Sequence, residues 1–284
     1  MEELRILTIG NSFTDSLARY FQPVVESAGC RLHFDRANFG GCEMVRHWSY
    51  VEAEEREPVC RIYQGGSTKL RDLLAREKWD VVTIQQASHQ SWRAESFHPW
   101  ADKLHDYIRK HAPGAEPVIQ QTWAYRADHP QFQPGGEWGI SQREMYDRLT
   151  ANYTALAKKL GLRVIPSGFA VQLSREQEPL PFENYDPALP EHLRWPDLPP
   201  QAGDVVGQCF WRKNPKSGEL ELRRDLIHLN ERGQYLQACV WFGFLFGRPV
   251  SDVAFVPEEL GNRDAAFLRD IAQQAIDRFE QVRP

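Results

Sequence analysis

The chain has 284 residues, of which 42% are hydrophobic and 26% charged, and its formal net charge is -5. A chain of this size and composition buries enough surface for one large domain or two small ones, without disulfides or metals. The slight acidity, with basic residues spread along the chain, excludes the charge pattern of a protein that binds nucleic acid or an anionic membrane surface.

The sequence has no segment near the roughly 20 apolar residues that span a bilayer. Its first residues, Met-Glu-Glu-Leu-Arg, lead directly into a strand-like segment without the apolar run of a signal peptide. The five cysteines form no CxxC pair and are odd in number, which is typical of reduced, buried thiols. We therefore expect a cytoplasmic protein, with a leader that has been removed as the alternative.

Strand-like and helix-like segments alternate through the first 166 residues. Residues 4–9 predict a strand that ends at Gly10-Asn11-Ser12, and a helical repeat of apolar residues follows from Leu17 to Gly29. The further predicted elements are strands at 31–37, 80–84, 117–121 and 163–166, and helices at 69–78, at 99–111 and from the Ser141-x-x-Glu144 capping box to Gly161. Five strands with intervening helices predict an α/β fold, a three-layer α/β/α sandwich around a five-stranded parallel sheet.

Residues 170–224 interrupt this alternation with many prolines. We interpret them as a surface insertion in a single domain that spans residues 1–284. A turn signal from Asn214 to Gly218 lies between two β-like runs and predicts a hairpin at the end of the insertion. Helices at 230–246 and 264–281 would complete the fold.

The residues that follow the predicted strands are the first candidates for chemistry, because an open parallel sheet binds ligands at the carboxyl ends of its strands. Ser12 follows the first strand and begins a helix. A turn would present its hydroxyl, and the free amides of the helix start could hold negative charge on a bound carbonyl oxygen. A serine that merely caps the helix is the alternative.

Asp225-Leu226-Ile227-His228 supplies what a serine nucleophile needs. A histidine near neutral pH accepts the hydroxyl proton, and a carboxylate on its far nitrogen holds the correct tautomer. Asp225 and His228, three residues apart, could come from one short turn. A metal-ligand pair or a polar loop that bonds to itself would have the same spacing.

Two further loops contain groups that could donate hydrogen bonds. Gly40-Gly41 would allow backbone amides to approach a ligand closely, and Gln85-Gln86-Ala87-Ser88 would add side-chain donors. A left-handed turn and ordinary hydrogen bonding at a strand end are the alternatives for these two loops.

The order of these four blocks resembles the SGNH (GDSL-like) hydrolase superfamily over roughly residues 4–247. The blocks Gly-Asn-Ser-Phe at residues 10–13 and Asp-x-x-His-Leu-Asn at 225–230 resemble more narrowly a bacterial branch of that superfamily described mainly as uncharacterised. The resemblance implies a flavodoxin-like fold, Ser12 as nucleophile, His228 as general base and Asp225 as its orienting carboxylate. It also implies an oxyanion hole that contains the amides of Ser12 and Gly41.

The third block of the resemblance, Gln85-Gln86-Ala87-Ser88, departs from the superfamily's usual Gly-x-Asn-Asp, whose Asn side chain is a donor to the oxyanion. We predict Gln86 as the substitute because it keeps a primary amide, with Gln85 or Ser88 as alternatives. His47, near the glycine loop, is either a substrate contact or a structural histidine. The residues that we expect to contact substrate are Asn11, Gly40, His47, Gln85, Ser88, Trp92 and Trp123.

The aromatic residues divide into two groups. One group is predicted to lie in the hydrophobic core, because its members share one apolar helix: Trp241, Phe242, Phe244 and Phe246. Trp48, Trp92, Trp123 and Trp138 lie in loops or after strands and are predicted either in the core or on the rim of the site. Two or more exposed tryptophans there would favour a carbohydrate ester, because aromatic faces stack against sugar rings.

The sequence thus predicts a serine esterase that hydrolyses carboxylic esters through an acyl-enzyme, with an acetylated carbohydrate as the favoured substrate. The alternatives are a lysophospholipase or thioesterase, a non-catalytic carbohydrate-binding relic of the fold, and a metal-dependent hydrolase that uses Asp225 and His228. No HExxH motif, CxxC pair or phosphate-binding glycine loop is present, so we expect no cofactor and no metal. The expected partner is a small-molecule or saccharide ester, and the sequence does not predict an oligomeric state.

Overall fold

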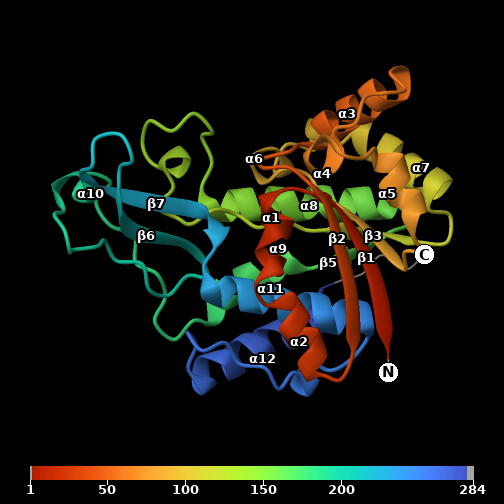
Figure 1. Cartoon of the computed structure of the whole chain (residues 1–284). Coiled ribbons are helices and arrows are strands. Elements are labelled where there is room, and N and C mark those ends of the chain that lie inside the picture. Colours follow the sequence, from red (N-terminus) through yellow and green to blue (C-terminus); the bar gives the residue numbers. More distant parts are fainter. Residues whose placement is uncertain (1, 280–284) are drawn as a thin grey trace.

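The fold contains two separate sheets, seen in a computed structural model that describes residues 2–279. One is a parallel sheet of five strands in the order β2-β1-β3-β4-β5, and the other is the antiparallel pair β6-β7 (Figure 1). The strands are β1 (Glu3–Gly10), β2 (Arg31–Asn38), β3 (Val81–Ile84), β4 (Glu116–Gln120), β5 (Arg163–Ile165), β6 (Val206–Lys213) and β7 (Leu220–Leu229). The predicted three-layer α/β/α sandwich with a five-stranded parallel sheet is confirmed.

Helices cover both faces of the parallel sheet (Figure 1). One layer contains α2 (Phe21–Ser27), α9 (Ser167–Gln177), α11 (Glu231–Phe246) and α12 (Asn262–Arg278). The other contains α3 (Met44–Arg56), α5 (Leu70–Arg76), α7 (Trp100–His111) and α8 (Gln142–Leu160). Four short helices are α1 (Ser12–Asp15), α4 (Tyr63–Gly66), α6 (Ser88–Ser91) and α10 (Leu189–His192). Among the helices of residues 2–279, none has the length and apolar character needed to cross a membrane.

The core lies on both faces of the central strands. All four residues of β3 are buried, and so are Ile6 to Gly10 of β1. Strands covered by helices on both sides form continuous apolar runs, which explains why the sequence predicts them well. Helix α11 is buried on nearly all sides from Tyr235 onward. Its four predicted core aromatics, Trp241, Phe242, Phe244 and Phe246, are all buried, as expected.

Local signals in the sequence place several element ends correctly. The hydroxyl of Ser141 accepts a hydrogen bond from the amide of Glu144 and caps α8, which ends at Gly161 in the left-handed conformation. The predicted hairpin is confirmed, and the amide of Gly218 donates to the carbonyl of Asn214 at its turn. The last predicted helix begins at Asn262, while its predicted end at residue 281 lies outside the described residues.

Helix α3 is absent from the predicted elements. Its inward-facing residues are Met44, His47, Val51 and Glu54, so polar side chains occupy two of the four buried positions. The carboxylate of Glu54 accepts hydrogen bonds from the amides of Ile62 and Leu70 at 2.8 and 2.9 Å. These polar residues interrupt the apolar periodicity from which a helix is normally predicted.

The predicted start of the insertion at residue 170 is wrong. Residues 170–174 are buried in α9, which packs against α11 and α12 as part of the body of the fold. The proline-rich segment begins only at Pro179. From there the chain forms a lobe with α10 and the β6-β7 hairpin, beside the carboxyl end of the parallel sheet (Figure 1).

We predict that Gly168→Ala destabilises the protein. Alanine normally stabilises a helix relative to glycine, but a Cβ at Gly168 would lie 2.0 Å from the carbonyl oxygen of Thr122. Urea unfolding should show a loss of about 2 kcal/mol, typical of overpacking. Gly114→Ala is the control, because a Cβ there meets no atom of residues 2–279 within 4 Å. Equal stability of the two variants would contradict the close packing of α9 on the segment after β4.

Candidate active site

Ser12, His228 and Asp225 form a chain of hydrogen bonds. The Nε2 of His228 lies 2.9 Å from the hydroxyl of Ser12, and its Nδ1 lies 2.8 Å from Oδ2 of Asp225. A carboxylate can only accept, so the proton of the neutral ring is on Nδ1 and Nε2 is free to accept the hydroxyl proton. The three side chains have the arrangement that serine hydrolases use to activate their nucleophile.

Backbone hydrogen bonds fix the orientation of Asp225. Its Oδ1 accepts the amides of Ile227 at 3.1 Å and His228 at 3.0 Å, while Oδ2 faces the imidazole. Burial raises the pKa of Asp225, but the hydrogen bonds from the side chain and backbone of His228 outweigh it and lower this pKa to about 2. The carboxylate is therefore ionised at neutral pH, as an orienting partner for histidine requires.

Asp225 and His228 lie near the end of strand β7 rather than on the separate turn expected from their spacing. The pairing of β7 with β6 is irregular between Val206 and Gln208, opposite this segment. A bulge of this kind bends a strand and re-aims its side chains. Beside this irregularity the side chain of His228 reaches Ser12, which follows β1 in the other sheet.

The predicted contact of Asn11 with substrate is wrong, because its side chain is buried and fully engaged. Its Oδ1 accepts the amide of Phe13 at 3.0 Å and the Nε2 of Gln85 at 2.6 Å. Its Nδ2 donates to the carbonyl of Cys42 at 3.0 Å. Asn11 therefore caps α1 and ties the turn that presents Ser12 to the glycine loop.

The amides of Ser12 and Gly41 are the two available backbone donors that the resemblance implies. Neither donates a hydrogen bond to another group within residues 2–279. Gly40 and Gly41 are exposed, and Gly41 has a φ of +59°, a conformation that favours glycine. Gly40 is therefore accessible, as its predicted contact with substrate requires.

The predicted role of Gln86 as the side-chain donor to the oxyanion is wrong. Its Nε2 donates to the carbonyl and the hydroxyl of Ser96, and its Oε1 accepts the amides of Met44 and Ala87. Gln86 is buried and holds the start of α3, directly after the glycine loop.

The two alternatives to Gln86 are buried as well. Gln85 donates to Asn11 and accepts from the hydroxyl of Thr14. The hydroxyl of Ser88 lies 2.9 Å from that of Tyr125. The third block thus supports the loops around Ser12 and presents no side chain on the surface of the site.

His47 was predicted either to contact substrate or to be a structural histidine, and the structure supports the second alternative. It is fully buried, with Nε2 at 2.9 Å from the carbonyl oxygen of Gly10 and Nδ1 at 3.1 Å from the hydroxyl of Tyr63. Burial lowers the pKa of His47 to about 4, so the ring is neutral at pH 7. The predicted contact of His47 with substrate is wrong, and the ring instead holds the last residue of β1.

The four tryptophans predicted in loops or after strands occupy three different environments, and Trp48 lies in helix α3. Trp123 is fully buried, so of its two predicted positions it has the one in the core, and its predicted contact with substrate is wrong. Trp48 is partly exposed but packs against Tyr107, between α3 and α7. Trp92 and Trp138 are partly exposed and lie against each other, with ring centroids 5.5 Å apart.

Trp92 and Trp138 are linked to Ser12 by a short series of ring contacts. The Trp138 ring lies 5.6 Å from that of Tyr125, which lies 6.5 Å from the ring of Phe13, the residue after the serine. The aromatic pair is therefore on the side of the molecule that contains the serine.

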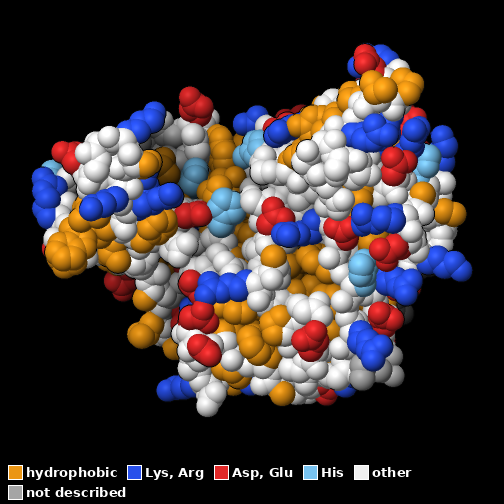
Figure 2. Space-filling view, in the orientation of Figure 1, with side chains coloured by type: hydrophobic (Ala, Val, Ile, Leu, Met, Phe, Trp, Pro, Cys, Tyr) orange, Lys and Arg blue, Asp and Glu red, His pale blue; other side chains and the backbone are white. Residues whose placement is uncertain are grey.

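The sequence reasoning missed His129, which lines a pocket of about 490 Å³ together with Pro130, His228 and residues 224–227. Burial lowers the pKa of His129 to about 4, so this ring is also neutral at pH 7. Histidine side chains gather in the hollow between the hairpin lobe and the body of the molecule in Figure 2. No motif surrounds His129 in the sequence, so only its position in space identifies it.

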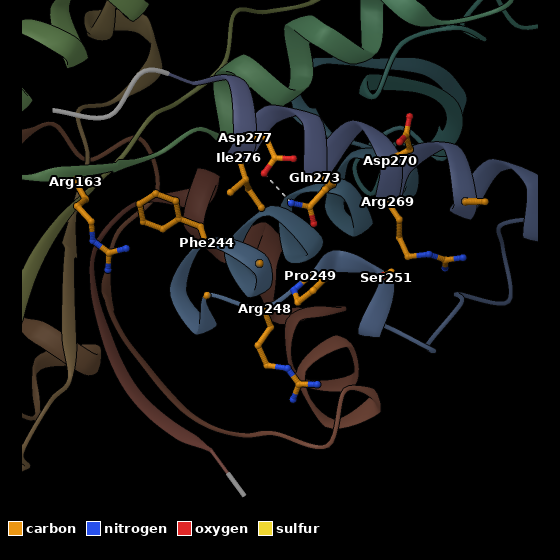
Figure 3. Close-up of a pocket in the computed structure, with 13 residues that line it drawn as sticks. Arg163, Phe244, Arg248, Pro249, Ser251, Arg269, Asp270, Gln273, Ile276 and Asp277 are labelled. Carbon is orange, nitrogen blue, oxygen red and sulfur yellow. Dashed lines mark hydrogen bonds between the residues drawn. The ribbon is translucent and has the colours of Figure 1, made fainter. Parts of the chain in front are cut away.

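A separate pocket of about 820 Å³ lies between α11, α12 and the start of β5 (Figure 3). Arg163, the first residue of β5, lines it, so it lies at the amino end of the parallel strands, opposite Ser12. Its arginines already have partners: Arg163 binds Glu116 at 2.7 Å and Arg248 binds Asp252 at 2.5 Å. This pocket is thus separate from the serine site.

Within residues 2–279, no three or more His, Cys, Asp or Glu side chains are grouped so that they could hold a metal ion. Asp225 and His228, the pair that a metal-dependent alternative would use, bind each other through their facing atoms.

We predict that the contribution of Asp225 to stability depends on pH. Its pKa is about 2 in the folded protein against an ordinary value of 3.8, so ionised Asp225 stabilises the fold above pH 4. This stabilisation is lost as the pH falls towards 2. The difference in thermal midpoint between wild type and Asp225→Asn should be largest near pH 6 and shrink below pH 4. Asp197→Asn, which changes an exposed carboxylate, is the control, and a difference independent of pH would contradict the hydrogen bonds assigned to the Asp225 carboxylate.

Comparisons with known proteins agree with this fold. The model of a domain of unknown function, DUF4886, matches residues 5–184. A DUF4886 family protein from Bacteroides uniformis ATCC 8492 has a similar structure, with 24% identity, a TM-score of 0.74 and coverage of 98% of this chain and 96% of that chain.

A protein from Slackia heliotrinireducens that is proposed to be an SGNH hydrolase is 19% identical, with a TM-score of 0.50 and coverage of 84% of this chain and 97% of that chain. No curated protein matches the sequence. The family model covers well over half of the chain, and the protein is therefore a member of the DUF4886 family.

Proposed function

We propose that the protein is a serine esterase that hydrolyses carboxylic esters through an acyl-enzyme. The observation that carries this proposal is the hydrogen-bonded series Ser12, His228 and Asp225, with 2.9 and 2.8 Å between the interacting atoms. Ser12 and His228 are both partly exposed at the carboxyl end of the sheet, where a substrate has access. A buried series of the same residues would not support the proposal.

In the first step, Oγ of Ser12 attacks the carbonyl carbon of the ester, and Nε2 of His228 takes the hydroxyl proton. Asp225 stabilises the imidazolium that forms. The tetrahedral intermediate then collapses, the bond to the alcohol breaks, and His228 returns the proton to the leaving oxygen. In the second step, water loses a proton to His228 and attacks the acyl-serine. The bond from the acyl carbon to Oγ then breaks, His228 returns the proton to Oγ of Ser12, and the acid leaves.

The negative charge on the tetrahedral intermediate is placed at the amides of Ser12 and Gly41. Each such donor stabilises a transition state by about 3 kcal/mol. Both amides come from loops that buried side chains hold in place, the first through Asn11 and the second through Gln86 at the start of α3. Two backbone donors in fixed positions can thus form an oxyanion hole without the side-chain amide that the third block was predicted to supply.

An acetylated carbohydrate is the proposed substrate. The support is the partly exposed pair Trp92 and Trp138, since flat aromatic faces pack against the C–H faces of sugar rings. Two guanidinium groups lie over the Trp92 ring, from Arg93 at 4.6 Å and Arg148 at 5.7 Å. Trp138 instead packs on Tyr125 and His129, with ring centroids 5.6 and 5.9 Å away, and its remaining exposed surface is the one proposed to contact a sugar.

The direct test is hydrolysis of nitrophenyl acetate. Ser12→Ala and His228→Ala should each lower kcat by roughly a thousandfold or more, because both steps need the nucleophile and its base. Ser27→Ala and His105→Ala, which change the same residue types elsewhere, should keep wild-type rates.

Other results would contradict the esterase proposal or favour one of its alternatives. Wild-type rates in both Ser12→Ala and His228→Ala would refute it. Glycan binding without labelling of Ser12 by a fluorophosphonate would favour a non-catalytic carbohydrate-binding protein. Loss of activity with a chelator would favour a metal-dependent hydrolase, and a preference for long-chain esters would favour a lysophospholipase or thioesterase.

The proposed carbohydrate substrate is tested separately with the variant Trp138→Ala. We expect KM for an acetylated xylo-oligosaccharide to rise about tenfold, which corresponds to the loss of about 1.4 kcal/mol of binding. Kinetics with nitrophenyl acetate should stay within twofold, because this substrate has no sugar. Trp48→Ala removes a partly exposed tryptophan between α3 and α7 and should change neither substrate. An unchanged KM for the sugar ester in Trp138→Ala would contradict the assigned substrate.

A further inference from the structure

His228 belongs to a strand that no backbone ladder connects to the strand before Ser12. Strand β7 pairs with β6 in a sheet of two strands, and neither belongs to the five-stranded sheet that contains β1. An isolated two-stranded hairpin is marginally stable by itself. Contacts other than strand pairing must therefore hold His228 at 2.9 Å from Ser12.

The segment that follows β4 provides these contacts. Residues 121–126 have no regular secondary structure and are all buried. Buried backbone needs hydrogen-bond partners, and here they come from both sides of the site. The amide of Gln121 donates to Ile165 in the parallel sheet, and the amide of Arg126 donates to Leu226 in the hairpin at 3.0 Å. The segment thus connects the two sheets.

Trp123, in the middle of this segment, contacts the neighbours of both Ser12 and His228. Its ring stacks on that of Phe13, with centroids 4.1 Å apart and an interplanar angle of 19°. Its indole N–H donates to the carbonyl oxygen of Ile227 at 2.9 Å. Phe13 directly follows Ser12, and Ile227 directly precedes His228. One rigid, fully buried side chain therefore spans the nucleophile and its base.

Several other hydrogen bonds restrain only one of the two sides. The carbonyl of Phe13 accepts from Gln237 at 2.9 Å and from Gln120 at 3.3 Å, which restrains the serine. The bond from Arg126 to Leu226 restrains the hairpin. Trp123 adds a direct restraint on the distance between the two sides.

We propose that Trp123 is a positioning residue that holds Ser12 and His228 at the distance needed for proton transfer. The proposal rests on the proposed esterase function. A displacement of about 1 Å between reacting groups can lower a rate by roughly a hundredfold. Loss of this contact should therefore reduce kcat while substrate binding is unchanged, because Trp123 does not reach the surface of the site.

The test compares Trp123→Phe with Trp241→Phe. Both tryptophans are fully buried, and both substitutions remove the same atoms from the core. The Nε1 of Trp241 has no hydrogen-bond partner among residues 2–279, so Trp241→Phe reproduces the packing change without the lost bond. We expect Trp123→Phe to lower kcat for nitrophenyl acetate, and the rate of fluorophosphonate labelling, by at least tenfold with KM within twofold. Trp241→Phe should stay within twofold of wild type in all three quantities.

A second variant tests the indole N–H alone. Replacement of Trp123 by benzothienylalanine exchanges this N–H for sulfur in a ring of nearly the same shape, and keeps the proposal testable if Trp123→Phe does not fold. Like Trp123→Phe, this variant should lower both kcat and the rate of fluorophosphonate labelling. Its thermal midpoint should stay close to that of wild type.

The outcomes separate the two proposals. If wild-type protein neither hydrolyses the ester nor is labelled, the esterase function fails. If wild type is active and the benzothienylalanine variant keeps its rates, or the two phenylalanine variants lose activity equally, only the positioning role of Trp123 is overturned.

Discussion

The hydrogen bond between Ser12 and His228 joins residues that are 216 positions apart in the sequence and belong to different sheets. A parallel sheet sets the position of Ser12, because β1 lies inside it with β2 and β3 as partners on its two sides. No such ladder sets the position of His228. The geometry of the site therefore depends on how the hairpin lobe packs against the carboxyl end of the sheet, and the segment after β4 forms much of that contact.

Buried ionic groups hold the lobe in place next to this segment. Arg126 is fully buried and binds both carboxylate oxygens of Asp128, at 2.7 and 3.0 Å. Tyr185 and Arg224 of the lobe also donate to Asp128. Burial lowers the pKa of Arg126, but the hydrogen bonds and charge of Asp128 raise it further, so the guanidinium stays charged. Such a network costs desolvation energy and favours one particular packing of the lobe.

Polar side chains beneath the site act mainly as supports. Asn11, His47, Gln85 and Gln86 come from different elements, and each is buried with its hydrogen bonds directed to other parts of the protein. They fix the backbone on either side of Ser12 and Gly41. A catalytic surface formed by backbone amides needs such supports, since a loop amide is useful only if its direction is fixed.

The sequence by itself determined the elements that depend on near neighbours. The strands, the cap at Ser141 and the hairpin turn at Asn214 arise from interactions within a few residues, and continuous apolar runs identify the central strands because both faces are covered. Residue type and spacing also marked Ser12, Asp225 and His228 as candidates. Helix α3 was beyond this reasoning, since its buried polar residues are satisfied by partners outside the helix.

Only the tertiary structure decided which of the candidate side chains face the site. Trp123 and its acceptor Ile227 are 104 residues apart, and His47 and its acceptor Gly10 are 37 apart. A pattern of residue types does not specify such partners, because a tryptophan or a glutamine after a strand has the same local signals whether it is exposed or buried. The packing of distant segments determines its environment, and in this protein that packing placed Gln86, His47 and Trp123 beneath the site.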